Sequence, residues 1–212
     1  RFYAAGKISG SRFMKREGKA SQEAVLTSRL LARSLRPLFN HALRNDIQVI
    51  ITVLSLDQTH DPDILAILAA STALLISDIP WAGPIAAVRV GRIDRTLVIN
   101  PPYEDRDKSD LDLIGAGTAG KINMLEGGAQ EVAEDQLLEA FTLAQKYIRP
   151  LIDFQNKIKE EIGKEKMQIE IKKPGEDLTK QVHAFLEGKL DDVLYEADKK
   201  TRGEHLGGLK KS

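Results

Sequence analysis

The chain has 212 residues, of which 42% are hydrophobic and 29% are charged. This balance is typical of a globular protein with a buried core. The absence of cysteine excludes disulfide bonds and thiolate chemistry, and no apolar run reaches the roughly 18 residues that a membrane-spanning helix needs. We therefore expect a cytoplasmic protein with no membrane partner.

The formal net charge is zero, but the charges are unevenly distributed. Residues 1–50 contain ten Lys and Arg against three Asp and Glu, whereas residues 51–150 contain eight against fifteen. Residues 151–212 contain thirteen of each sign. Because nucleic-acid binding follows the local field rather than the total charge, the basic first segment keeps a nucleic acid among the candidate partners.

The two ends of the sequence predict a fragment. The first ten residues, RFYAAGKISG, contain neither a Met nor a signal-peptide pattern. The last residues, HLGGLKKS, are equally abrupt. We therefore expect this chain to belong to a longer protein.

Residues 1–21 are predicted to form a short strand followed by a loop, because Gly and Ser punctuate them. The loop sequence SRFMKREGKAS places Phe13 beside the cations Lys15 and Arg16. An aromatic ring can stack on a base for about 1–3 kcal/mol, and the cations can neutralise phosphates. The alternative is a solvated loop in which Phe13 turns inward.

Ser21 is a predicted N-cap for a helix that runs to Pro37. Its apolar positions can face a core; they are Val25, Leu26, Leu30 and Leu31. A second face contains Arg29, Arg33 and Arg36, at spacings of four and three residues. Guanidinium groups one turn apart suit successive phosphate oxygens. The alternative is ion pairing to the acidic middle of the chain, for example to Asp57 or Asp63.

Residues 46–56, rich in β-branched side chains, are predicted to form a strand. Asp61 and Pro62 then open an apolar helix that ends near Ser77 and should be buried. Two hairpins are expected to follow. The first pairs residues 84–93 with 96–100, and the second pairs residues 111–118 with 121–127, turning between Gly117 and Gly120.

From about residue 131 the sequence has helical periodicity, with Pro150 as an expected kink. Residues 167–178 are a connector, and residues 179–200 are predicted to be helical again. The sequence therefore predicts an α+β domain over residues 1–130 and a small all-α domain over residues 131–212.

Several motifs occur in the order and spacing of the polynucleotide phosphorylase family. They are AAGKISGSRFMKREGKAS, LTSRLLARSLRPLF, NDIQVIITVLSLD, DPDILAILAASTALLISDIPWAGPIAAVRVGRI and LDLIGAGT. The chain resembles that family's first ribonuclease PH-like domain, without its first strands, and the helical domain that follows. The resemblance implies βαβ sheets with packed helices, as in the ribosomal protein S5 domain 2-like fold.

The resemblance implies a 3′-to-5′ phosphorolytic exoribonuclease that acts in mRNA degradation as a homotrimer and converts RNA and phosphate to nucleoside diphosphates. Mg²⁺ and inorganic phosphate would bind to a second ribonuclease PH-like domain that this chain lacks. An RNA helicase or endoribonuclease of a degradosome is a further candidate partner. The family's loop at the central RNA channel matches Phe13, Met14, Lys15 and Arg16, where Met14 replaces an aromatic residue and Lys15 an arginine. The arginines at 29, 33 and 36 match a family set implicated in binding RNA or phosphate.

When the family's catalytic pattern is aligned with this chain, several of its residues are replaced by residues of other types. Its two metal-associated aspartates and its lysine fall on Arg106, Asp112 and Ile114, and its phosphate-binding serines fall near Pro62, Asp63 and Ile64. The resemblance therefore implies neither a catalytic residue nor a metal ligand here, and gives Asp110 and Asp112 turn or strand-end roles.

Three functions remain in competition. The leading hypothesis is a non-catalytic half of an RNA-degrading phosphorylase, which threads single-stranded RNA and builds the trimer. The second is a free-standing RNA-binding scaffold subunit of an exosome-like ring, which a stop codon after Ser212 would favour. The third is that this domain is itself an enzyme, against which Arg106 and Ile114 argue.

Overall fold

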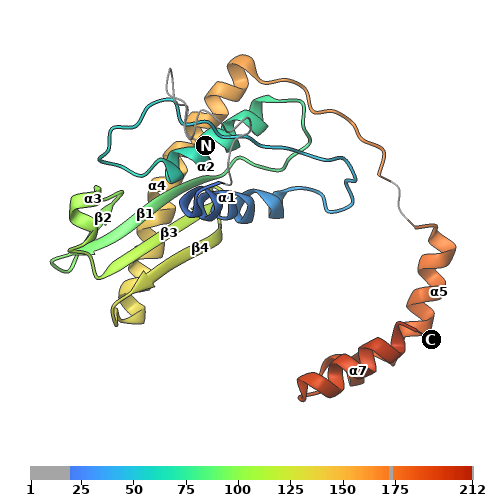
Figure 1. The fold of residues 1–212 in the computed structure, drawn as a ribbon. Coiled ribbons are helices and arrows are strands. Elements are labelled where there is room, and N and C mark those ends of the chain that lie inside the picture. Colours follow the sequence, from blue (N-terminus) through green and yellow to red (C-terminus); the bar gives the residue numbers. More distant parts are fainter. Residues whose placement is uncertain (1–19, 172–173, 212) are drawn as a thin grey trace, which may run out of the picture. The chain divides into compact units, whose positions relative to one another are not determined.

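The structure is a computed structural model that describes residues 20–171 and 174–211 (Figure 1). The predictions for residues 1–19, including those for Phe13, Lys15 and Arg16, lie outside the described residues. The chain divides into two compact units, Arg1–Ile169 and Glu170–Ser212. None of the described helices combines the length and apolar character needed to cross a bilayer.

The first two predicted helices are confirmed. Helix α1 spans Gln22–Leu35 and continues into a 3₁₀ turn, η1, over Arg36–Leu38. The Ser21 hydroxyl accepts a hydrogen bond from the Ala24 amide at 3.2 Å. Helix α2 spans Pro62–Ile76, and the Asp61 carboxylate caps it by accepting from the Asp63 amide. Both helices thus begin where short polar side chains satisfy their first free amides.

The expectation that Val25 and Leu26 face the core is wrong. Their exposed fractions are 40% and 59%, whereas Leu30 and Leu31 are buried as predicted. The buried residues of α1 all lie in its second half, so only that half packs against the rest of the unit. The periodicity placed the apolar face correctly but could not show where along the helix the core ends.

Both predicted hairpins are confirmed, and together they form one antiparallel sheet. Its strands are β1 (Ala86–Ile93), β2 (Thr96–Ile99), β3 (Leu111–Gly117) and β4 (Ile122–Ala129), in the spatial order β2-β1-β3-β4. The turn between β1 and β2 has positive φ at Asp94 and Arg95, as a two-residue hairpin of this type requires. A single helical turn, α3 (Tyr103–Arg106), lies between β2 and β3.

Helices cover both faces of this sheet. Helices α1 and α2 pack on the face that includes Ala87, Ile114 and Ala116. Helix α4 (Glu134–Ile162) packs on the opposite face, against Val88, Val90 and other residues of β1 and β3. Because β1 is covered on both faces, its first six residues are all buried. The predicted α+β class is therefore confirmed.

Three hydrogen bonds form a ring that joins Ser71 of α2, Gln155 of α4 and the backbone of Ile85, directly before β1. The Ser71 hydroxyl donates to Gln155 Oε1 at 2.6 Å and accepts from the Ile85 amide at 3.0 Å. Gln155 Nε2 donates to the Ile85 carbonyl at 2.9 Å. All three residues are fully buried. Each polar group therefore has the partner that burial demands.

The strand predicted for residues 46–56 is wrong. The structure assigns only one bridge residue there, Val53. The predicted alternation is present, because Val49, Ile51 and Val53 are half-buried while their neighbours Ile50 and Leu54 are exposed. Side-chain alternation decides which side of a segment faces the core, whereas a strand also needs a partner strand, and the described sheet consists of β1 to β4 alone.

The unit from Glu170 onward contains three described helices: α5 (Glu176–Leu186), α6 (Leu190–Leu194) and α7 (Lys199–Leu209). The continuous helix expected over residues 179–200 is interrupted at Gly188, whose φ of 73° is left-handed. The predicted domains, residues 1–130 and 131–212, stay a prediction, and the compact units divide elsewhere, after Ile169.

Candidate nucleic-acid interface and a closed ion-pair site

The three arginines of the predicted RNA-binding stripe are all exposed: Arg29 and Arg33 lie on α1, and Arg36 is the first residue of η1 directly after it. Arg33 donates from Nη1 to Glu126 Oε2 at 2.8 Å, and the two side chains are 56% and 45% exposed. Across the described ranges, no carboxylate lies within ion-pair distance of Arg29 or Arg36. The stripe therefore presents two uncommitted guanidinium groups and one that shares its charge with β4. Their binding to RNA stays a prediction.

The two aspartates considered as partners for this stripe have other partners. Asp57 accepts from the amides of Thr59 and His60, and its carboxylate lies 2.8 Å from the His60 ring nitrogen Nδ1. The hydrogen bond to the His60 side chain lowers the pKa of Asp57. Asp63 pairs with Arg89. In the part of the chain that the structure describes, ion pairing of the stripe with the acidic middle thus occurs at Arg33 alone, through Glu126.

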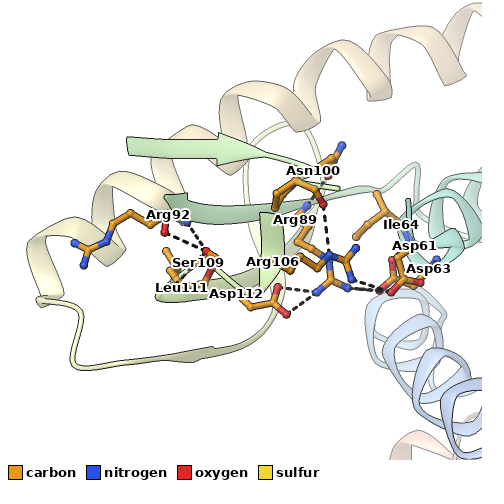
Figure 2. A network of polar contacts seen from close by, with 11 residues as sticks. Asp61, Asp63, Ile64, Arg89, Arg92, Asn100, Arg106, Ser109, Leu111 and Asp112 are labelled. Carbon is orange, nitrogen blue, oxygen red and sulfur yellow. Dashed lines mark hydrogen bonds and ion pairs between the residues drawn. The ribbon is translucent and has the colours of Figure 1, made fainter. Parts of the chain in front are cut away.

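Arg89 of β1 is the centre of a second charged site, shown in Figure 2. Its Nη2 donates to Asp63 Oδ2 at 2.5 Å, and its Nη1 lies 2.6 and 2.7 Å from the two carboxylate oxygens of Asp112. Only 8% of the Arg89 side chain is exposed. Its position follows from the sheet register, because Arg89 pairs with Ile114 and so lies on the same face of the sheet as Asp112.

A second guanidinium group completes this site. Arg106 donates from Nη1 to Asp61 Oδ2 at 3.1 Å, and its guanidinium carbon lies 4.7 Å from the centre of the Tyr103 ring. Asp61 Oδ2 also lies 3.7 Å from Arg89 Nη2. Two arginines and three aspartates from α2, β1, α3 and β3 thus form one connected network.

The network gathers the positions that the family resemblance assigned to one catalytic site. By that resemblance, the family's phosphate-binding serines fall near Asp63, and its two metal-associated aspartates fall on Arg106 and Asp112. Ile114, at the position of the lysine, is buried in the apolar core beneath α1 and α2. The structure therefore brings these residues together, with ion pairs where a reaction centre would need free ligands.

Burial and the neighbouring opposite charges have opposing effects on the pKa values of Asp63 and Arg89. Burial raises the pKa of Asp63, although the neighbouring Arg89 and the hydrogen bond from the Ile64 amide act to lower it. Burial acts to lower the pKa of Arg89, but Asp63 and Asp112 outweigh it and raise that pKa. The guanidinium therefore stays charged, and its interaction with Asp63 compensates the cost of placing a carboxylate in a buried position.

These residues do not fit a magnesium ion. Mg²⁺ needs carboxylates with free oxygens and room for its waters. Both oxygens of Asp112 and both oxygens of Asp63 already accept hydrogen bonds, and the Arg106 guanidinium adds positive charge beside Asp61. Elsewhere in the described ranges, no group of three or more metal-binding side chains is close enough to hold a metal ion.

Arg92 and Asp110 form a separate pair at the start of β3. Arg92 donates from Nε and Nη2 to the two oxygens of Asp110, at 2.7 and 2.5 Å. The hydrogen bond from Arg92 lowers the pKa of Asp110. Backbone bonds from the Asp110 amide to Arg92 and from the Gln130 amide to Asp110 fix the strand end. This position agrees with the strand-end role that the resemblance implied for Asp110.

The sequence reasoning missed Arg89, although a signal was present. The segment AAVRVGRI is apolar before and after this residue, and a cation in a strand that is buried on both faces requires a paired carboxylate. The pattern could have identified Arg89 as paired. Its partners, 26 and 23 residues away, could not be read from it.

Two parts of the chain match models of one known protein family. Residues 1–80 match the 3′ exoribonuclease family, domain 1, and residues 83–147 match domain 2 of the same family. The chain belongs to the 3′ exoribonuclease family. The resemblance predicted from the sequence motifs is confirmed.

Similar proteins of this family are named polyribonucleotide nucleotidyltransferase. The chain is 46% identical over 210 residues to the one from Syntrophomonas wolfei and 44% identical over 210 residues to the one from Clostridioides difficile. A third, from Alkaliphilus oremlandii, is 46% identical over 206 residues. These alignments cover 99%, 99% and 97% of this chain but only 30%, 30% and 29% of the relatives. The chain thus spans about a third of their length.

Proposed function

We infer that this chain is a non-catalytic part of a 3′-to-5′ phosphorolytic exoribonuclease, which binds single-stranded RNA and contributes to a homotrimer. The complete reaction would transfer the 3′-terminal nucleotide of RNA to inorganic phosphate and release a nucleoside diphosphate. That reaction, with its magnesium and phosphate sites, would take place on a second ribonuclease PH-like domain, which is distinct from residues 83–147 and lies outside this chain. A cytoplasmic location and partners in a degradosome stay predictions from the resemblance.

The observation that carries this proposal is the Arg89 network. A phosphorolytic site must hold phosphate and a metal ion, and phosphate needs hydrogen-bond donors and positive charge around it. Here the resemblance places the family's phosphate-binding serines near Asp63, whose buried carboxylate would repel phosphate. The charge of Asp112 is already paired, since both of its carboxylate oxygens accept from Arg89. The site is therefore suited to holding α2, β1 and β3 together.

RNA binding is supported by the exposed cations of α1. Arg29 and Arg36 have no carboxylate partner in the described ranges, and an arginine can bind a phosphate through two parallel hydrogen bonds. In the loop predicted for residues 11–21, Phe13, Lys15 and Arg16 would add a base-stacking ring and two further cations. Such a surface binds RNA without sequence preference and with strong salt dependence.

The proposal can be tested with the purified 212-residue chain, labelled oligo(A), inorganic phosphate and Mg²⁺. We expect RNA binding by fluorescence anisotropy and no ADP by thin-layer chromatography. Polyribonucleotide nucleotidyltransferase from Clostridioides difficile serves as the parallel reaction. Phosphate-dependent release of ADP by the chain alone would overturn the non-catalytic assignment.

The loop can be tested separately with the triple variant F13A/K15A/R16A. We expect it to bind oligo(A) more weakly, by roughly tenfold or more, because one stacking contact and two phosphate contacts are removed. The unfolding midpoint should stay at the wild-type value. An unchanged affinity for oligo(A) at low salt would show that these three residues do not contact the RNA.

A further inference from the structure

A groove on the opposite side of the sheet from α1 and α2 contains three cations that the proposed function does not use. It lies between the β3–β4 turn and α4 and has a volume of about 510 Å³. Lys121 comes from the turn, and Lys146 and Arg149 come from α4. Phe141 and Gln145 also line the groove, and none of its described lining residues is a carboxylate.

The groove is held in shape by hydrogen bonds. Gln145 Nε2 donates to the carbonyls of Thr118 and Ala119, both at 3.0 Å. Arg149 donates from Nε to the Ala119 carbonyl at 3.2 Å, and the Thr118 amide donates to the Lys121 carbonyl at 2.9 Å. The turn is therefore fastened to α4 before any ligand arrives, which lowers the entropy cost of binding.

The three cations of the groove are free to bind an external anion. Lys121, Lys146 and Arg149 are exposed, and in the described part of the chain none of them forms an ion pair. Asp153, one helical turn beyond Arg149, is not within ion-pair distance of it. The Nε bond of Arg149 leaves its two terminal nitrogens free for an anion. The acidic residues Asp135 and Glu139 line a neighbouring hollow, which shares Lys146 with the groove.

We propose that this groove binds the phosphodiester backbone of single-stranded RNA, as a second contact surface beside the arginine stripe of α1. The inference rests on the proposed function. Three cations with no carboxylate among the described lining residues match a row of phosphates, and the half-buried Phe141, which packs against the core, lines the same groove. RNA is favoured over an acidic peptide because its backbone carries a negative charge at every nucleotide and RNA is already the ligand of the proposed function.

The two surfaces are connected through residues 118–123. On one side this stretch contacts α4 through Gln145 and Arg149. On the other side Asn123 donates from Nδ2 to the Ser34 carbonyl, near the C-terminal end of α1. The end of the β3–β4 hairpin therefore lies between the helix that presents Arg36 and the helix that presents Lys146. RNA held by the arginine stripe can continue around this end into the groove.

The test uses the full 212-residue chain and labelled oligo(A), with the variant K121Q/K146Q. No described hydrogen bond or ion pair involves either lysine side chain, so the unfolding midpoint should not change. We expect the affinity to fall by roughly three- to tenfold. The slope of log affinity against log salt should become shallower by about 0.7 for each phosphate that the variant no longer neutralises.

The matched control is K157Q/K159Q, which removes the same charge from α4 outside the groove. Both control residues are exposed, and we expect the affinity to stay within about twofold of the wild type. If the two double variants weaken binding equally, the proposal that the groove binds RNA is wrong, whereas the proposed function is unaffected. If the wild-type chain binds no oligo(A), both are overturned together.

Discussion

Arg89 and the pair Arg29 and Arg36 show two opposite environments for the same side chain. Arg89 is buried in the central strand, and all its described ion pairs are with aspartates of the same unit. Arg29 on α1 and Arg36 at the start of η1 are exposed and have no carboxylate partner in the described ranges. The first guanidinium holds strands and helices together, whereas the other two are free to bind an external anion.

Arg33 lies between these two cases. It is exposed like Arg29, yet it bonds to Glu126 of β4. An exposed pair of this kind contributes little to stability, commonly less than about 1 kcal/mol, and RNA phosphates can compete for it. The number and burial of carboxylate partners, rather than residue type, therefore separate structural arginines from binding arginines.

The largest effect should follow from R89M, which leaves Asp63 buried beside no cation. Removing one partner of a buried pair costs about 3–5 kcal/mol, so we expect a loss of this order in the free energy of unfolding, measured with urea. The double variant R89M/D63L should recover part of the loss, because no buried charge remains. A loss below about 1 kcal/mol in R89M would contradict the structural role of Arg89.

The next largest effect should be seen in R29Q/R36Q. Removing two free cations should weaken oligo(A) binding by roughly tenfold and reduce the salt slope by about 0.7 per phosphate. The free energy of unfolding should change little, since neither side chain has an ion pair to lose in the described ranges. R44Q, which removes another exposed arginine, is the control. If R44Q weakens binding by the same factor per charge removed as R29Q/R36Q, then net charge, and not the stripe, determines binding.

A smaller effect concerns pH and the pair of Arg92 with Asp110. The hydrogen bond from Arg92 lowers the pKa of Asp110 from its ordinary value of 3.8. The ionised carboxylate therefore stabilises the fold above that value, and this contribution is lost as pH falls through the lower pKa of the folded state. We expect D110N to be less stable than the wild type at pH 6 and the difference to shrink toward pH 2. A difference that is constant with pH would exclude this linkage.

The smallest effect should follow from E126Q, which releases Arg33 from its only described carboxylate partner. We expect the affinity for oligo(A) to rise by roughly two- to threefold, because one more guanidinium becomes available and one negative charge is removed. E131Q removes the same charge at another exposed position and should change the affinity less. If both variants bind equally, Glu126 acts only through net charge.

Local sequence signals predicted much of the fold. Ser21 and Asp61 marked two helix starts correctly, and Asp94 and Arg95 marked the turn of the first hairpin. The failures concern relations beyond local sequence. The alternation in residues 46–56 was real but did not specify a ladder, and the apolar face of α1 extends beyond the core at Leu26.

The site could be predicted only in part. The resemblance identified Asp63, Arg106 and Asp112 as members of one site, and the structure brings them together. It could not identify Arg89 as their common neighbour, because this contact depends on sheet register. The pairing of Arg33 with Glu126 spans 93 residues and depends on how α1 packs against β4. Such partners are fixed by tertiary packing and leave no local pattern.

The bonds among Ser71, Ile85 and Gln155 have a consequence for how this family can change its sequence. In the Arg89 network, the two most buried side chains, Arg89 and Asp63, can be exchanged together for apolar ones, and the carboxylates that remain, Asp61 and Asp112, are more exposed to water. In this second set the third member is the backbone of Ile85, whose amide and carbonyl are bonded by Ser71 and Gln155. No substitution removes a peptide group. Evolution and protein engineering must therefore keep a donor and an acceptor here, or admit a water molecule.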